Sequence, residues 1–139
     1  MIDNYFLLGD LIIGQLKSSV PALHNEVHPW YEFDDMESHS TPGCYVMYAG
    51  DKIESVAVSG ARHTVKQTWH TTLRFSGMRD SNATRVAAGQ VVSQVLSALG
   101  GWKPDSLIMP LVRAEVHNGV MYEGGMMLVI LGWETSFVQ

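Results

Sequence analysis

The segment from His63 to Phe75 carries the longest regular pattern in the chain and limits the possible folds more than any other. Two sets of side chains alternate along it, Val65, Gln67, Trp69, Thr71, Leu73 and Phe75 in one set and Lys66, Thr68, His70, Thr72 and Arg74 in the other. Because successive side chains of a β-strand point to opposite faces, this alternation predicts a long strand. The rest of the chain must supply its neighbours.

The flanking segments predict two more strands and a helix. Cys44–Ala49 and Lys52–Val58 are runs of strand-forming residues, and Gly50-Asp51 between them is typical of a tight hairpin turn. After the long strand, residues 82–99 carry apolar side chains at helical spacing, and Gly100-Gly101 indicates the end of that helix. We therefore expect strand, strand, strand and helix in this part of the chain.

A first helix is predicted from Asp3, a suitable N-cap, to about Ser18. Its polar positions form only a narrow stripe, so we expect it to be buried on more than one side. One side would face the sheet, and the other would face either a neighbouring subunit or a loop of the same chain. Leu8, Ile12 and Leu16 are therefore candidate subunit-interface residues.

An acidic segment follows the first helix. Ala22–Phe33 predicts a strand that Pro29 places at a sheet edge or breaks, and Asp34–Ser40 predicts a loop. No Lys or Arg occurs from residue 18 to 51, whereas acidic residues accumulate there. Three of them, Asp34, Asp35 and Glu37, are further candidates for a subunit interface.

The C-terminal part predicts the remaining strands. Leu107–Val116 reads as a strand interrupted by Pro110, and Val120–Glu123 with Met126–Phe137 forms a last strand or a broken hairpin. A strand at residues 126–133 would be apolar on both faces. The helices can cover one face, so the other face must be covered by loops of the chain or by another subunit. The element order α-β-β-β-β-α-β-β in one domain, 1–139, predicts an α+β fold. Two main helices would pack on a mixed, largely antiparallel sheet.

The composition argues against several classes of function. The net charge is -5, and the nine Lys and Arg form no basic run, so we predict no binding to nucleic acid. Tyr5–Leu16 is too short to cross a bilayer, so no membrane partner is expected. Cys44 is alone and forms no disulfide within the chain.

Two groups of side chains could hold a metal ion. His24 and His28 flank Glu26, but Pro21 and Pro29 argue against the helix that would align them, which favours polar residues on an edge. The three acidic interface candidates could bind a hard cation, but they lack the EF-hand spacing and favour a solvated loop.

No catalytic constellation is apparent. Asp51 and His63 are near each other only in sequence, and the chain has neither a nucleophile elbow nor a phosphate-binding glycine loop. We therefore predict a protein that is not an enzyme and has no catalytic, metal or cofactor site.

Three segments resemble the tail-terminator proteins of long-tailed bacteriophages and prophages. These are Pro42–Gly50, Gln67–Phe75, and Val95–Pro104 with its Gly-Trp-x-Pro turn. The order of elements agrees over nearly the whole chain, and only His24–Ser40 has no counterpart.

The resemblance implies a small α+β domain that assembles into a ring, typically a hexamer. Such a ring caps the tail tube, stops its polymerisation and presents a surface for joining the head. The implied partners are other copies of the chain, the tail tube protein and the head–tail connector protein. The implied location is the virion tail, after synthesis in the host bacterial cytoplasm.

Two alternatives remain. One is a small dimeric α+β enzyme or ligand-binding protein, with an internal pocket lined by Trp69, His70 or methionines. The other is a head–tail connector protein of the same particle, which tail length would distinguish from a terminator.

Overall fold

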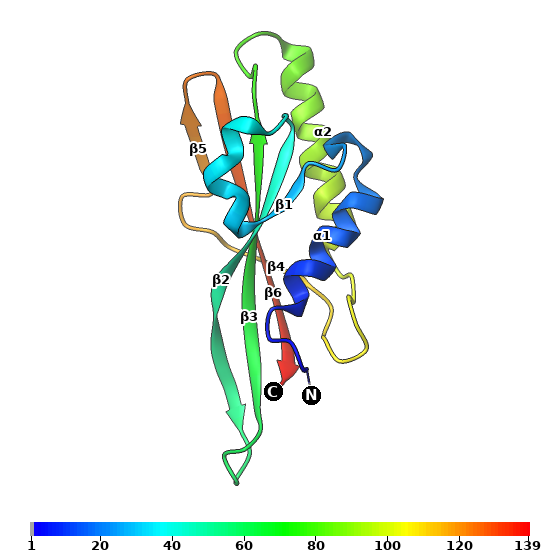
Figure 1. The fold of residues 1–139 in the computed structure, drawn as a ribbon, viewed down its shortest axis with the longest axis vertical. Helices are drawn as coiled ribbons and strands as arrows, with labels where there is room; N and C mark the ends of the chain where they lie inside the picture. The colour runs from blue at the N-terminus through cyan, green and yellow to red at the C-terminus, as the bar shows by residue number, and fades with distance from the viewer. Residues whose placement is uncertain (1) are drawn as a thin grey trace.

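A six-stranded sheet carries two helices on one face (Figure 1). The computed structural model describes residues 2–139. Its elements are α1 (Leu7–Ser19), η1 (Pro21–Leu23), β1 (Val27–Pro29), η2 (Trp30–Ser38), β2 (Gly43–Val56), β3 (His63–Phe75), α2 (Asn82–Leu99), β4 (Val112–Ala114), β5 (Val120–Glu123) and β6 (Met126–Val138). The strand order is β1-β2-β3-β6-β4, and β5 also pairs with β6. Among the strands of residues 2–139, only β1 and β2 run parallel, which confirms the predicted α+β class with a largely antiparallel sheet.

The core lies between the helices and the face of β3 that the alternating pattern predicted. That face meets one side of α1 and one side of α2 in a single apolar cluster, which includes Leu8, Ile12, Leu16, Trp69, Leu73, Val91, Val95, Leu99, Leu131 and Trp133. The bounds of β3 and α2 match the sequence predictions. The Ser81 hydroxyl caps α2 by accepting from the backbone N–H of Thr84 at 3.1 Å.

The predicted hairpin turn at Gly50-Asp51 is wrong. β2 continues through these residues to Val56, with irregularities in its pairing to β3 between Tyr48 and Gly50 and between Ile53 and Ser55. Gly50 has a φ of 116°, which glycine adopts readily, so the extra residue fits into the strand as a bulge. Three strands therefore precede α2 instead of the predicted four, and the turn between β2 and β3 lies at residues 57–62.

The N-terminal third also differs from the prediction. α1 begins at Leu7 without a side-chain cap, so Asp3 is not its N-cap. The predicted strand 22–33 is reduced to Val27–Pro29, and residues 30–38 form the 3-10 helix η2 where a strand end and a loop were expected. Proline has no N–H for the sheet ladder, which explains why pairing stops at Pro29.

The C-terminal hairpin of β5 and β6 is present, but the strand predicted at 107–116 is reduced to β4. Residues 126–130 of β6 are half-exposed on a sheet whose helices cover only one face. The second cover that the sequence required for this stretch is therefore not fully supplied by the chain itself.

Close packing of α1 on Trp69 leads to a stability prediction. A Cβ on Gly9 would lie 2.6 Å from both Cζ3 and Cη2 of Trp69, whereas a Cβ on Gly14 would meet nothing within 4 Å. We expect Gly9→Ala to lower the free energy of unfolding by about 1–3 kcal/mol through overpacking. Gly14→Ala should raise it by about 0.5–1 kcal/mol, because alanine favours the helix. Urea unfolding measures both, and equal effects of the two variants would contradict this packing.

Candidate functional site

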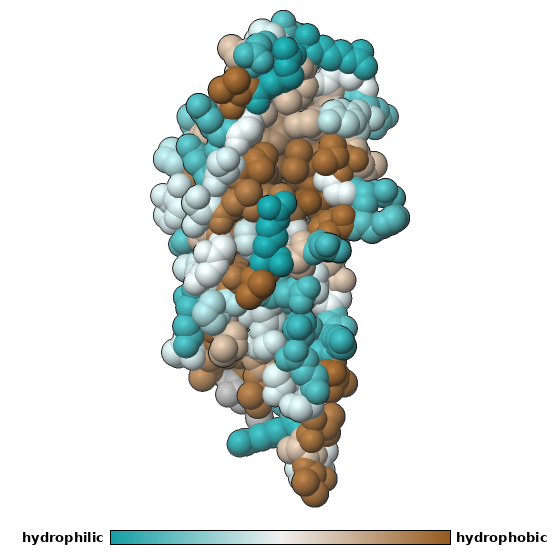
Figure 2. Space-filling view, turned by 180° about the vertical axis from the view of Figure 1, so that it is seen from behind, coloured by the Kyte–Doolittle hydropathy of each residue, from teal (hydrophilic) through white to brown (hydrophobic). Residues whose placement is uncertain are grey.

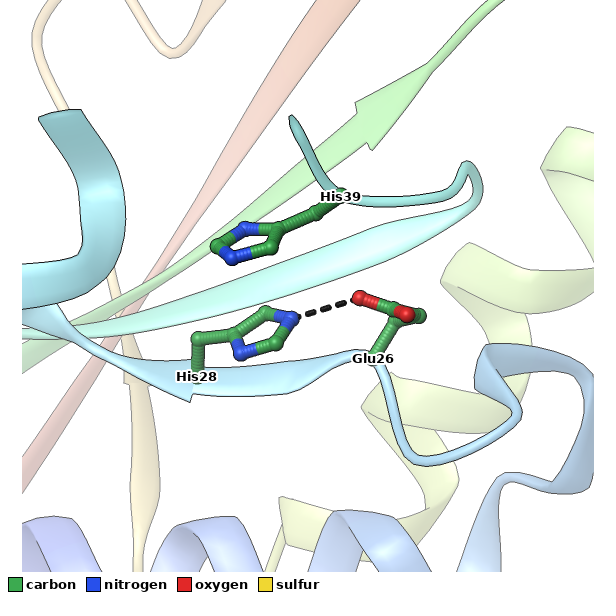
Figure 3. Close-up of side chains that lie close together, drawn as sticks. All are labelled: Glu26, His28 and His39. Carbon is green, nitrogen blue, oxygen red and sulfur yellow. Dashed lines mark hydrogen bonds and ion pairs between the residues drawn. The ribbon is translucent and has the colours of Figure 1, made fainter. Parts of the chain in front are cut away.

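Glu26, His28 and His39 converge beside the β1 end of the sheet (Figure 3). Glu26 precedes β1, His28 lies within it, and His39 directly follows η2. One potential metal-binding atom from each residue lies within 4.8 Å of those from the other two, and all three side chains are half-buried. We call these three residues with Glu32 and Tyr45 the His28 cluster.

Both ring nitrogens of His28 face carboxylates. Nε2 lies 2.6 Å from Glu26 Oε2, and Nδ1 lies 2.7 Å from Glu32 Oε2. A neutral imidazole has only one N–H group to donate. If both carboxylates are ionised, His28 must therefore be an imidazolium, or a cation must replace one of its two protons. The His28 cluster thus places one imidazole ring between two carboxylates.

His39 completes the cluster by packing on the His28 ring. Its ring stacks on His28 with 3.9 Å between centroids and an interplanar angle of 12°, and its Nδ1 lies 2.7 Å from the Tyr45 hydroxyl. Arg74 holds the same end of η2, because its Nη1 donates to the backbone carbonyls of Met36 and His39 at 2.8 and 3.2 Å. η2 is thereby fastened to β2 and β3.

The sequence indicated this cluster only in part. Its spacing of His24 and His28 around Glu26 favoured polar residues on an edge over a metal site, and His24 does not belong to the group that the structure brings together. It missed His39, which is 11 residues from His28 in the chain, because η2 was predicted as a strand end and a loop. A 3-10 turn that brings His39 back onto His28 leaves no periodic signal in the sequence.

The six candidate interface residues occupy two different environments. Leu8, Ile12 and Leu16 are 2%, 0% and 0% exposed and belong to the core with Trp69 and Leu73, so they lie on the side of α1 that faces the sheet. Asp34, Asp35 and Glu37 are exposed on η2. In the part of the chain that the structure describes, these three acids do not converge as a group of metal ligands.

Two apolar surfaces are exposed along β2. A groove of about 760 Å³, here called the aromatic groove, is lined by Phe6, Trp30, Tyr31, Phe33, Asp34, Met47 and Tyr48. The second surface is the hairpin tip, with Ile53, Val56 and Val58 exposed around the turn between β2 and β3. This hairpin extends beyond the rest of the molecule, and hydrophobic side chains gather at its end (Figures 1 and 2).

Asp51 links the N-terminal segment to β2. The hydroxyls of Tyr48, at 2.7 Å, and Tyr5 both donate to Asp51 Oδ2. These hydrogen bonds hold the pKa of the Asp51 carboxyl below its ordinary value, and the nearby charge of His63 lowers that pKa further. Because both tyrosines donate to it, Asp51 acts as a structural hydrogen-bond acceptor.

The residues proposed to line an internal pocket do not form one. Trp69 is 3% exposed and belongs to the apolar core, and its indole N–H donates to Gln67 Oε1 at 2.8 Å. His70 lies on the opposite face of β3, where partial burial lowers its pKa. Among the described helices, none has the length and apolar character needed to cross a membrane.

Comparison with known proteins gives two findings. A family model described as phage tail terminator protein matches residues 2–139. A chain in the solved virion of a native gene transfer agent particle has a similar structure, with a TM-score of 0.58 and 13% sequence identity over 95% of this chain and 95% of that chain. At this identity the second finding shows a shared fold. No curated protein sequence matches the chain.

The lowered pKa of Asp51 predicts a pH-dependent contribution to stability. A carboxyl group whose pKa is lower in the folded protein than in the unfolded chain stabilises the folded state. This stabilisation is complete above the unfolded-chain pKa of about 3.9, and it is lost as the pH falls through the pKa of the folded protein. We expect Asp51→Asn to melt below the wild type at pH 7, with a difference that shrinks below about pH 4. Melting curves at both pH values test this, with Asp35→Asn on η2 as the exposed control. A difference independent of pH would contradict the assignment.

Proposed function

Since the chain belongs to the family of phage tail terminator proteins, we propose that its copies form a ring that caps the tail tube. The family is structural, so the chain is a component of the virion tail and not an enzyme, as the sequence resemblance predicted. In our proposal the ring ends polymerisation of the tube protein and offers a surface to the head–tail connector. The family match over residues 2–139 is the observation that carries this function.

The shape of the chain supports assembly into a ring. A closed ring of identical subunits with head-to-tail contacts needs two different surfaces that fit each other. In our proposal the protruding hairpin tip and the concave aromatic groove are this pair of surfaces. Exposed apolar patches of this kind are typical of protein interfaces.

We assign the aromatic groove to the hairpin tip of a neighbouring copy. Trp30 and Tyr31, which are 61% and 65% exposed, would form the apolar centre of the contact. Asp34 lines the groove, with Asp35 beside it in sequence, and Arg62 lies in the turn at the tip. Opposite charges at the margin would fix the orientation of the contact. A hexamer is the ring size that the family resemblance implies.

The alternatives are less well supported. A ligand-binding protein or enzyme would need the internal pocket that the packed core around Trp69 does not leave, and the family is structural. A connector in the same particle could also form a ring, so tail length is the property that separates it from a terminator.

Tail length tests the capping function. Particles that lack this protein should carry tails longer than normal and of variable length, because nothing ends polymerisation of the tube. Loss of a connector would instead leave tails of normal length without heads. Electron microscopy of particles from the deleted and complemented strains measures this, and normal tail length after deletion would contradict the proposal.

A charge exchange tests the subunit contact. Arg62→Asp and Asp34→Arg should each weaken self-association by about tenfold. The double variant should restore self-association, because the two exchanged charges are again opposite in sign and attract each other. Light scattering across protein concentration measures the assembly. Arg79→Asp, an exposed change before α2, is the control. If the double variant assembles less than either single variant, the groove and the tip are not partners.

A further inference from the structure

The His28 cluster already has the outer hydrogen bonds that metal-binding histidines use. A histidine ligand normally presents one ring nitrogen to the metal and donates from the other to a carboxylate or another acceptor. The Nδ1 of His28 faces Glu32, and the Nδ1 of His39 faces the Tyr45 hydroxyl. Each ring is therefore oriented through Nδ1, and the Nε2 of His28 faces the Glu26 carboxylate, which belongs to the same group of potential ligands.

The remaining atoms form a compact ligand set. Nε2 of His28 points at Glu26, and the His39 ring lies over His28 (Figure 3). Glu26 comes from the turn before β1, His28 lies in β1, and His39 follows the end of η2. Their convergence therefore does not require the regular residue spacing of a single helix. All three side chains are half-buried, which limits competition by water.

We propose that Glu26, His28 and His39 bind one divalent transition-metal ion of the zinc class. Two imidazole nitrogens and one carboxylate oxygen are a ligand set that zinc accepts, with a water in the fourth position. Magnesium and calcium prefer sites made of oxygen ligands, so this set disfavours them. The ion takes the place of the proton between His28 Nε2 and Glu26, and His39 tilts out of its stack on His28 to reach it.

The consequence of metal binding is a clamp on η2. The ion joins the end of η2 to β1, next to the place where Arg74 already holds the carbonyls of Met36 and His39. η2 carries Trp30, Tyr31 and Asp34 of the aromatic groove. A bound ion therefore makes the groove more rigid without touching it.

Zinc titration of the purified full-length chain, free of any affinity tag, tests the site. We expect one Zn²⁺ per chain by calorimetry, a higher melting temperature with Zn²⁺ and no such rise with Mg²⁺. Co²⁺ should give the visible absorption of a nitrogen- and oxygen-ligated ion. His39→Gln should weaken Zn²⁺ binding at least tenfold, and Glu32→Gln should weaken it about 10–100-fold through the orientation of His28.

His24→Asn is the matched control. His24 lies two residues from Glu26 with a φ of 47°, a conformation that asparagine tolerates, and it is outside the cluster. It should bind Zn²⁺ as the wild type does. Absence of stoichiometric Zn²⁺ binding by the wild type, or an equal loss in His24→Asn and His39→Gln, overturns the proposal. Melting curves without metal confirm that each variant is folded.

Discussion

The pairing of β3 with β6 is the contact on which the rest of the structure depends. Trp69 and Trp133 lie directly opposite each other on the helix side of this pair, and both are buried. Their indole N–H groups donate to Gln67 and Thr71, two polar residues that are themselves fully buried on β3. Gln67 in turn donates to the Tyr5 carbonyl at 2.7 Å, so every polar group named here has a partner.

The arrangement of the helices follows from this pair of tryptophans. α1 approaches Trp69 so closely that a Cβ at position 9 would overlap the edge of the indole ring. Both helices then cover one face of the sheet, and the other face receives only partial cover from η2 and the residue after it, because Phe33 and His39 pack on Tyr45. Two exposed apolar surfaces, the hairpin tip and the aromatic groove, lie away from this core. A structural protein that works by contact with copies and partners needs such surfaces more than it needs a pocket.

Sequence patterns predicted the elements that are determined by neighbouring residues in the chain. They failed for elements that are determined by contacts with residues far away in the sequence. β3 and α2 were predicted with their observed bounds, because alternation and helical spacing each repeat over 13 residues or more. Gly50-Asp51 has the composition of a turn, yet β3 is long enough to pair with β2 on both sides of it, so the chain forms a bulge there. η2 was missed because a 3-10 helix packed on Tyr45 and held by Arg74 has no periodic apolar pattern of its own.

The sequence by itself determined the α+β class, the central strand, the second helix and the resemblance to tail terminators, because these follow from side-chain periodicity and residue order. The tertiary structure alone decided that Leu8, Ile12 and Leu16 face inward and that His39 returns to Glu26 and His28. Which side of an apolar helix is covered, and which distant side chains meet, depends on how the sheet twists and where the chain folds back. No local sequence pattern indicates either of these two properties.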